Sequence, residues 1–362
     1  MQLLQMGELS FNDLYFRSKY ESFAILGTVN WSSPRKNFVN RVILLSLSTI
    51  VFLTHTLSPS GIASTKNLPN KSLEQLSKNV NLIYPLVWQK TNASVNLTKS
   101  TTPKLRIELG PDSKIYSKNI RQAFDLTMKV FNGVELPQTT IFLVSNGEDE
   151  EWANKRYKEL LGNNYNPENI GYGRSPNGNA VQLKRFDPSN KELLKDPNVP
   201  NGGTDAHGFT HLLQEYQLGV GDETFQGVPR WILEGSADFM QIYYLKRNNY
   251  TFWLLNRQGQ DIKQHSIKFL NEYLTYVPFE ELSGAETPWY ITNKYPDQWA
   301  YSIGSYVCDI LVALKGPSSL IQIYRDYVET KDFDKSFENI YGMPWSEAKP
   351  YVAQILYKLA RR

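Results

Sequence analysis

The sequence predicts an α+β protein in which a sheet-containing part precedes a mostly helical part. Two observations carry this prediction. Between residues 105 and 184, short β-rich runs alternate with segments whose apolar residues recur at helical spacing. After about residue 204, the helical spacing continues nearly to the end of the chain. Strands and helices followed by helices alone are typical of α+β proteins.

The sheet-containing part is expected to hold three strands and two helices. Strands are expected where β-rich runs end at turn residues, and helices where apolar residues recur every three or four positions. In chain order these are strand 105–109, helix 120–131, strand 139–144, helix 148–161 and strand 180–184. A loop rich in Gly, Asn and Pro precedes the last strand.

Composition narrows the classes of function. Hydrophobic residues make up 41% of the 362-residue chain, which is enough to build a core. Lys and Arg number 39 against 36 Asp and Glu, a net charge of +3, so nucleic acid is not expected as a partner. The single cysteine, Cys308, excludes an intrachain disulfide and a Cys-based zinc cluster, and its apolar helical surroundings predict a core position.

Segment 42–63 predicts export. Its apolar core, 42–53, follows three basic residues and precedes the small residues Gly61 and Ala63, which is the order of a secretory signal peptide. The alternative is an uncleaved membrane anchor over 42–57, although 16 residues are fewer than the ~20 that span a bilayer comfortably. The basic flank predicts an extracytoplasmic protein, either secreted, periplasmic or held at the membrane by this segment.

The remaining boundaries follow from composition. Residues 1–41 are interpreted as a short tail or as the product of a start codon assigned too early. Residues 64–104 are mostly rich in Ser, Thr, Asn and Lys and are predicted to be a polar linker, although the apolar patch 82–88 could dock on the domain. The folded domain is expected over 105–362.

The candidate metal site starts with two of the four histidines. His207 and His211 are four residues apart, which places both imidazoles on one face of a helix. One helix can offer two nitrogens to one Zn²⁺ in this way. Taken alone, the motif is also compatible with two histidines that bind no metal.

A second segment strengthens the metal interpretation. Glu234 follows His211 by 23 residues and lies in an otherwise apolar helical stretch, where a carboxylate needs a partner. A metal held by the two histidines would be that partner. Asp238 lies on the same helical face as Glu234 and could accept the outer N–H of a ligating histidine.

These residues resemble the gluzincin metallopeptidases, the peptidase-MA-like group. The resemblance rests on His-x-x-x-His followed by Pro-Arg-Trp-x-x-Glu-Gly-x-Ala-Asp-Phe, and it covers roughly 105–355. It implies a gluzincin-like fold in which His207, His211 and Glu234 bind zinc. The run from Tyr301 to Gly304 is similar to a Tyr-x-x-Gly helix of the aminopeptidase branch, which implies that the Tyr301 hydroxyl stabilises an oxyanion.

The chain departs from the family at Gly208. The family has glutamate there, and that glutamate is the general base that takes a proton from zinc-bound water. Asp205 and Glu215 do not occupy its position on the helix. Loss of general acid–base help typically costs ~10²–10⁴-fold in rate.

Three functions are therefore kept open. The first is an exported zinc-binding, metallopeptidase-like protein with lost or reduced peptidase activity. The second is an active but atypical zinc hydrolase. The third is a non-catalytic extracytoplasmic module that binds a peptide, a protein or the cell wall along an edge strand at 180–184.

Overall fold

The structure is a computed structural model of the chain. It describes residues 71–97, 103–166, 171–186, 195–219, 227–258 and 298–362. All of them belong to one unit, Pro69–Arg362. The expected N-terminal tail and the expected export signal lie outside the described residues.

The strands form a four-stranded mixed sheet in the order β1-β2-β4-β3. Strands β1 (Lys104–Leu109), β2 (Thr139–Ser145) and β4 (Ala180–Arg185) are parallel, and the short β3 (Tyr172–Arg174) pairs antiparallel with β4. The expectation that 180–184 is an edge strand is therefore wrong. The three-residue strand β3, which the Gly- and Pro-rich composition of its loop concealed, covers that edge.

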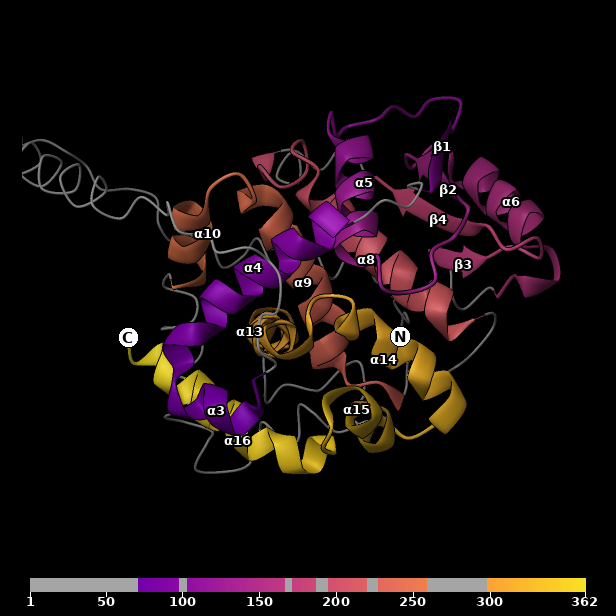
Figure 1. The fold of residues 1–362 in the computed structure, drawn as a ribbon. Helices are drawn as coiled ribbons and strands as arrows, with labels where there is room; N and C mark the ends of the chain where they lie inside the picture. Colours follow the sequence, from indigo (N-terminus) through magenta and orange to yellow (C-terminus); the bar gives the residue numbers. More distant parts are fainter. Residues whose placement is uncertain (1–70, 98–102, 167–170, 187–194, 220–226, 259–297) are drawn as a thin grey trace, which may run out of the picture. The chain divides into compact units, whose positions relative to one another are not determined.

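The two faces of the sheet carry different partners. Helix α6 (Glu150–Leu161) packs on one face, where Tyr157 meets Val181 and Leu183. Because side chains alternate along a strand, Gln182 points to the opposite face. Helices α5 (Ile120–Val130) and α8 (Gly203–Leu218) lie on that face (Figure 1).

Helices make up the rest of the described chain after α8. In order they are α9 (Arg230–Lys246), α10 (Tyr250–Arg257), α13 (Gln298–Lys315), α14 (Ser319–Thr330), α15 (Phe333–Tyr341) and α16 (Trp345–Ala360). Together with the sheet, these helices confirm the expected α+β class. Cys308 is fully buried in α13, as expected for a core residue.

The expected polar linker is wrong over 73–97. That segment forms α3 (Leu73–Lys78), a 3₁₀ turn and α4 (Ile83–Leu97), and these helices pack on α16 and α13, respectively. The physical reason is the spacing of the few apolar residues. Ile83, Leu86 and Val87 recur on one helical face and are buried, while the polar residues occupy the other face.

Helices α9 and α13 cross at two glycines. A Cβ added to Gly235 would overlap the backbone of Gly304, and a Cβ added to Gly304 would overlap the carbonyl oxygen of Trp231. Backbone atoms cannot move aside as a flexible side chain can. The Tyr-x-x-Gly run therefore includes a glycine that the helix crossing requires, next to Glu234.

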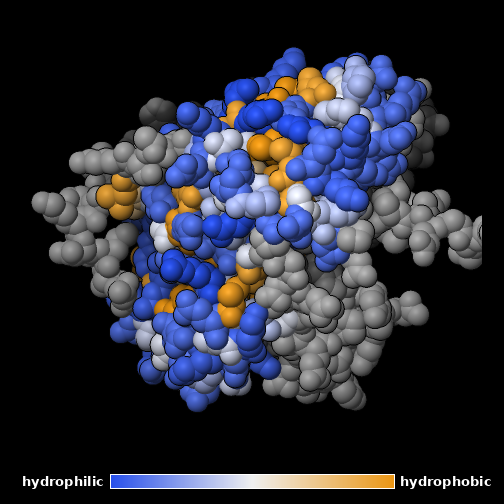
Figure 2. Space-filling view, turned by 90° about the vertical axis from the view of Figure 1, so that its right-hand side faces the viewer, coloured by the Kyte–Doolittle hydropathy of each residue, from blue (hydrophilic) through white to orange (hydrophobic). Residues whose placement is uncertain are grey.

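Hydrophobic residues on the face in Figure 2 form small groups between hydrophilic ones. Within the described ranges, no single helix is long and apolar enough to cross a membrane. Two helical segments joined by a sharp bend, Ile303–Lys315 and Ser319–Thr330, meet the length and composition of a span together.

Candidate metal centre

Helix α8 presents the two histidines of the sequence motif side by side. The Nε2 atoms of His207 and His211 are 3.0 Å apart, as their i, i+4 spacing on one helical face predicts. Helix α8 begins after Gly202, whose φ of +83° is accessible to glycine, and it ends at Gly219 with a φ of +88°. The two glycines mark the ends of the helix, and the two histidines lie between them.

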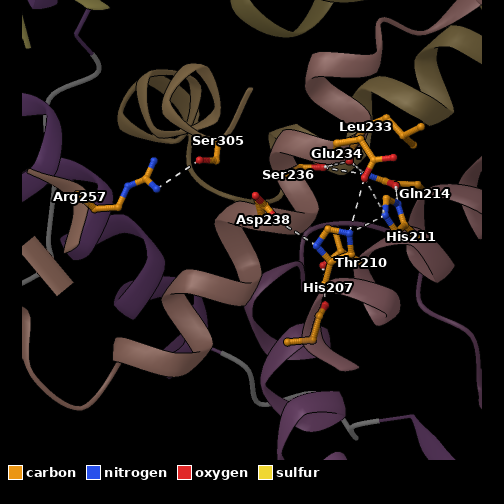
Figure 3. Close-up of polar contacts among 11 residues, drawn as sticks. His207, Thr210, His211, Gln214, Leu233, Glu234, Ser236, Asp238, Arg257 and Ser305 are labelled. Atoms are coloured by element: carbon orange, nitrogen blue, oxygen red, sulfur yellow. Dashed lines mark hydrogen bonds and ion pairs between the residues drawn. The ribbon is translucent and has the colours of Figure 1, made fainter. Parts of the chain in front are cut away.

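Glu234 reaches the same point from α9. Its Oε2 atom lies 3.6 Å from Nε2 of His207 and 3.4 Å from Nε2 of His211. The carboxylate is buried, and Oε2 has no hydrogen-bond partner in the described part of the chain. The three side chains form a group that could hold one metal ion. Figure 3 shows both rings and the carboxylate pointing toward one another.

A glutamine fixes the proton position on His211. Nε2 of Gln214 donates to the carbonyl oxygen of Leu233 at 2.9 Å and to Ser236 Oγ at 2.6 Å. Its Oε1 therefore faces Nδ1 of His211, at 2.7 Å. Because an amide oxygen only accepts, His211 must carry its proton on Nδ1.

Asp238 lies on the outer side of the His207 ring. Its Oδ1 is 3.2 Å from Nδ1 of His207, so a carboxyl oxygen faces that nitrogen. When both rings are neutral, both Nε2 atoms therefore present lone pairs to each other and to Glu234. Two ring nitrogens and a buried carboxylate oxygen this close need either a hydrogen atom between the two nitrogens or a metal ion among all three.

The electrostatics of the group agree with that requirement. Burial by itself raises the pKa of Glu234, but the two imidazoles outweigh burial and hold this pKa well below its ordinary range. Burial lowers the pKa of His207, but the neighbouring carboxylates of Asp238 and Glu234 outweigh burial, so the net pKa is raised. The carboxylate is thus ionised, and its surroundings favour positive charge.

The position after His207 is filled from the sheet. A Cβ added to Gly208 would lie 2.7 Å from Nε2 of Gln182 and 3.7 Å from the Tyr172 hydroxyl. The carboxamide of Gln182 therefore occupies the space into which a side chain at residue 208 would extend. The sequence leaves residue 208 without a side chain, and the structure adds that a neighbouring side chain fills the gap.

Two other carboxylates near the motif already have partners. Asp205 is buried and forms an ion pair with Lys184. Asp238 faces His207. Neither therefore takes the position of a general base.

Two tyrosines flank the histidines. The ring centroid of Tyr172 lies 5.8 Å from that of His211, and the ring of Tyr301 stacks on His207 with centroids 6.1 Å apart. Burial, aided by the charges of Glu234 and Glu215, raises the pKa of Tyr172, so its hydroxyl stays neutral near pH 7. The structure thus brings Tyr301 to the motif, against a ring of the histidine pair.

Sequence reasoning missed Gln182 and Gln214. Gln214 lies three residues after His211 on the same helix, so its spacing was a usable signal. Gln182 is a polar residue in an expected strand, and only the packing of α8 against that strand places it beside Gly208.

No family model, curated protein or solved structure matches the chain. The centre is therefore defined by its own residues and distances.

Proposed function

We propose that the chain is an exported, zinc-binding, metallopeptidase-like protein whose peptidase activity is lost or strongly reduced. The metal is assigned from the donor set. Two imidazole nitrogens and one carboxylate oxygen form a typical zinc set that leaves a fourth position open. Tetrahedral zinc with bonds of ~2.0–2.1 Å separates its ligand atoms by about 3.3 Å. The three separations here, 3.0, 3.4 and 3.6 Å, fit that spacing.

The chain's own residues hold the ligands in place. Gln214 and Asp238 keep the Nδ1 protons outward, so that both Nε2 lone pairs face the open centre. When bound, zinc supplies a Lewis acid that polarises a carbonyl and lowers the pKa of a bound water. Tyr301, stacked on His207, is proposed to stabilise an oxyanion there.

The observation that carries the loss of activity is the pair Gly208 and Gln182. Residue 208 has no side chain, and the neighbouring space holds a carboxamide, which does not accept a proton near neutral pH. Asp205 and Asp238 are engaged elsewhere, so within the described ranges neither of these two carboxylates is placed to deprotonate a water. Binding and polarisation remain, while general-base catalysis does not.

A binding module is the second candidate, and strand β3 supports it. This edge strand carries Tyr172, whose ring lies beside His211, and helix α8 packs against it. A peptide or protein ligand that added a strand to β3 would pass the metal centre. An atypical active hydrolase is the third candidate. It is supported by the three side chains that could hold a metal ion, His207, His211 and Glu234.

The test is the metal content of the purified full chain. We expect elemental analysis to find about one zinc per chain, and much less after His211→Ala or Glu234→Gln. Glu338→Gln, which changes an exposed carboxylate on α15, is the matched control and should keep its zinc. Equal zinc content in all four proteins would show that His211 and Glu234 do not bind the zinc. Robust chelator-sensitive cleavage of casein by the parent chain would instead favour the active hydrolase.

A further inference from the structure

Gln182 is an unusual residue for its place in the sheet. It is 4% exposed, and its neighbours on β4, Val181 and Leu183, are apolar core residues. Its Oε1 atom is buried without a hydrogen-bond partner in the part of the chain that the structure describes. Leaving a buried acceptor unpaired costs ~1–3 kcal/mol. An apolar residue would fill this position at lower cost, so the carboxamide indicates a partner that the described residues do not supply.

The position of Gln182 indicates where that partner would bind. Its Nε2 atom lies 2.7 Å from the place of a Cβ on Gly208, the residue directly after the ligand His207. Tyr172 is the Cα partner of Gln182 across the β3–β4 pair, and its ring lies beside His211. The amide of Gln182 and the Tyr172 side chain therefore border the same side of the metal centre, over the first turn of the ligand pair.

We propose that Gln182 is a ligand-binding residue of the metal centre and that it selects ligands with an amide N–H next to the oxygen that binds the metal. This inference rests on the proposed metal function and adds a ligand class to it. A carboxamide offers one acceptor and a donor group, which match the N–H and C=O of a peptide amide. The unpaired Oε1 accepts the ligand N–H, and the metal takes the ligand oxygen.

Two small probes separate this role from simple metal binding. Acetohydroxamate carries an N–H beside its metal-binding oxygens, whereas acetate binds metal through oxygen and has no N–H. Both would be titrated into the full chain loaded with Co²⁺, whose visible spectrum reports ligand binding directly. Gln182→Met keeps the length of the side chain and removes its polar atoms, and Gln182→Ala is a second variant.

Thr140→Val is the matched control. Its hydroxyl is also buried without a partner in the described residues, and it lies on the adjacent strand, where Thr140 is the Cα partner of Ala180. We expect Gln182→Met and Gln182→Ala to weaken acetohydroxamate binding about tenfold, as the loss of one hydrogen bond implies. Acetate affinity should change less than threefold, and Thr140→Val should change neither.

The outcomes are distinguishable. Cobalt bands in all proteins with equal acetohydroxamate affinities would overturn the role of Gln182 and leave the metal centre intact. Equal weakening of both probes would show that Gln182 only fills space, which also overturns the proposal. Absence of cobalt bands in the parent chain would overturn the metal centre and this ligand-binding role with it.

Discussion

The carboxamide of Gln182 lies where a side chain at position 208 would begin. A Cβ at Gly208 would lie 2.7 Å from Nε2 of Gln182, closer than real Cβ contacts come, so one of the two must move. Glycine is a poor residue in a helix interior by ~1 kcal/mol relative to alanine. Helix formation therefore does not explain this glycine, and an added Cβ would displace the end of the flexible Gln182 side chain.

A double-mutant cycle measures this coupling. In the parent chain, we expect Gly208→Ala to leave the free energy of unfolding nearly unchanged, because displacing the Gln182 carboxamide offsets the ~1 kcal/mol gain in helix propensity. In a Gln182→Ala background, the same change should stabilise the chain by ~1 kcal/mol. Urea unfolding of the four metal-free proteins gives the four free energies. Equal effects of Gly208→Ala in the two backgrounds would show that the side chains do not interact.

Gln214 should control metal affinity without contacting the metal. Gln214→Leu removes the acceptor that keeps the His211 proton on Nδ1, so we expect zinc affinity to fall ~10–100-fold. Competition with a chromophoric chelator measures the change. Gln241→Leu, a buried glutamine further along α9, is the control and should keep parental affinity. A loss of stability in both variants with unchanged affinity in both would assign Gln214 a purely structural role.

The glycine crossing should be among the most sensitive points of the helical part. Gly304→Ala places a Cβ against the carbonyl oxygen of Trp231, and neither helix can yield without separating α9 from α13. We expect a loss of at least 2–3 kcal/mol in the free energy of unfolding and weaker zinc binding, because α9 carries Glu234. Gly147→Ala is the control, since nothing lies within 4 Å of an added Cβ there. A thermal shift of Gly304→Ala no larger than that of the control would contradict the close crossing.

The sequence was sufficient for the features that depend on local spacing. The strands at 105–109, 139–144 and 180–184 and the intervening helices lie close to their expected places, because periodicity reports which side chains face a core. The i, i+4 histidines and the later glutamate also meet as their spacing predicts.

Features that depend on long-range packing were out of reach. Composition made 64–104 look like a linker, although four or five apolar residues on one face are enough to pack α4 on α13. The three-residue strand β3 is too short for a period, so β4 looked like an edge. The contact between Gln182 and Gly208 could not be predicted either, because these residues lie on separate elements and meet only when α8 packs on the sheet.

Zinc binding should depend on pH through His207. In the metal-free chain its pKa is raised above the ordinary value of 6.5, because Asp238 and Glu234 outweigh burial. Zinc requires the unprotonated Nε2, so metal and proton compete. We expect zinc affinity to rise as pH increases, to continue rising above pH 6.5, and to level off once pH exceeds the raised pKa. Calorimetry in buffers of different ionisation enthalpy should show proton release at pH 6.5. Affinity that is independent of pH from 5.5 to 8 would contradict His207 as a ligand.

Restoring a general base should require two changes rather than one. Gly208→Glu by itself forces its side chain against Gln182, so we expect it to destabilise the chain and to yield no more cleavage than the parent. Gly208→Glu combined with Gln182→Ser frees the space, and the new carboxylate then lies one residue after His207, within reach of a water at the open position of the centre. General-base catalysis typically contributes ~10²–10⁴-fold to the rate, so a small fraction of it would be measurable if the parent chain has no activity.

Cleavage of casein or a fluorogenic peptide is measured with and without a chelator, and Gln182→Ser alone is the control. Activity in the double variant that the chelator abolishes, and that His211→Ala also abolishes, would establish that the centre lacks only its base. If Gly208→Glu alone gains as much activity as the double variant, Gln182 does not block the position. If the double variant binds zinc and stays inactive, the chain lacks more of the hydrolytic machinery than its base, and the binding role along β3 becomes the better account.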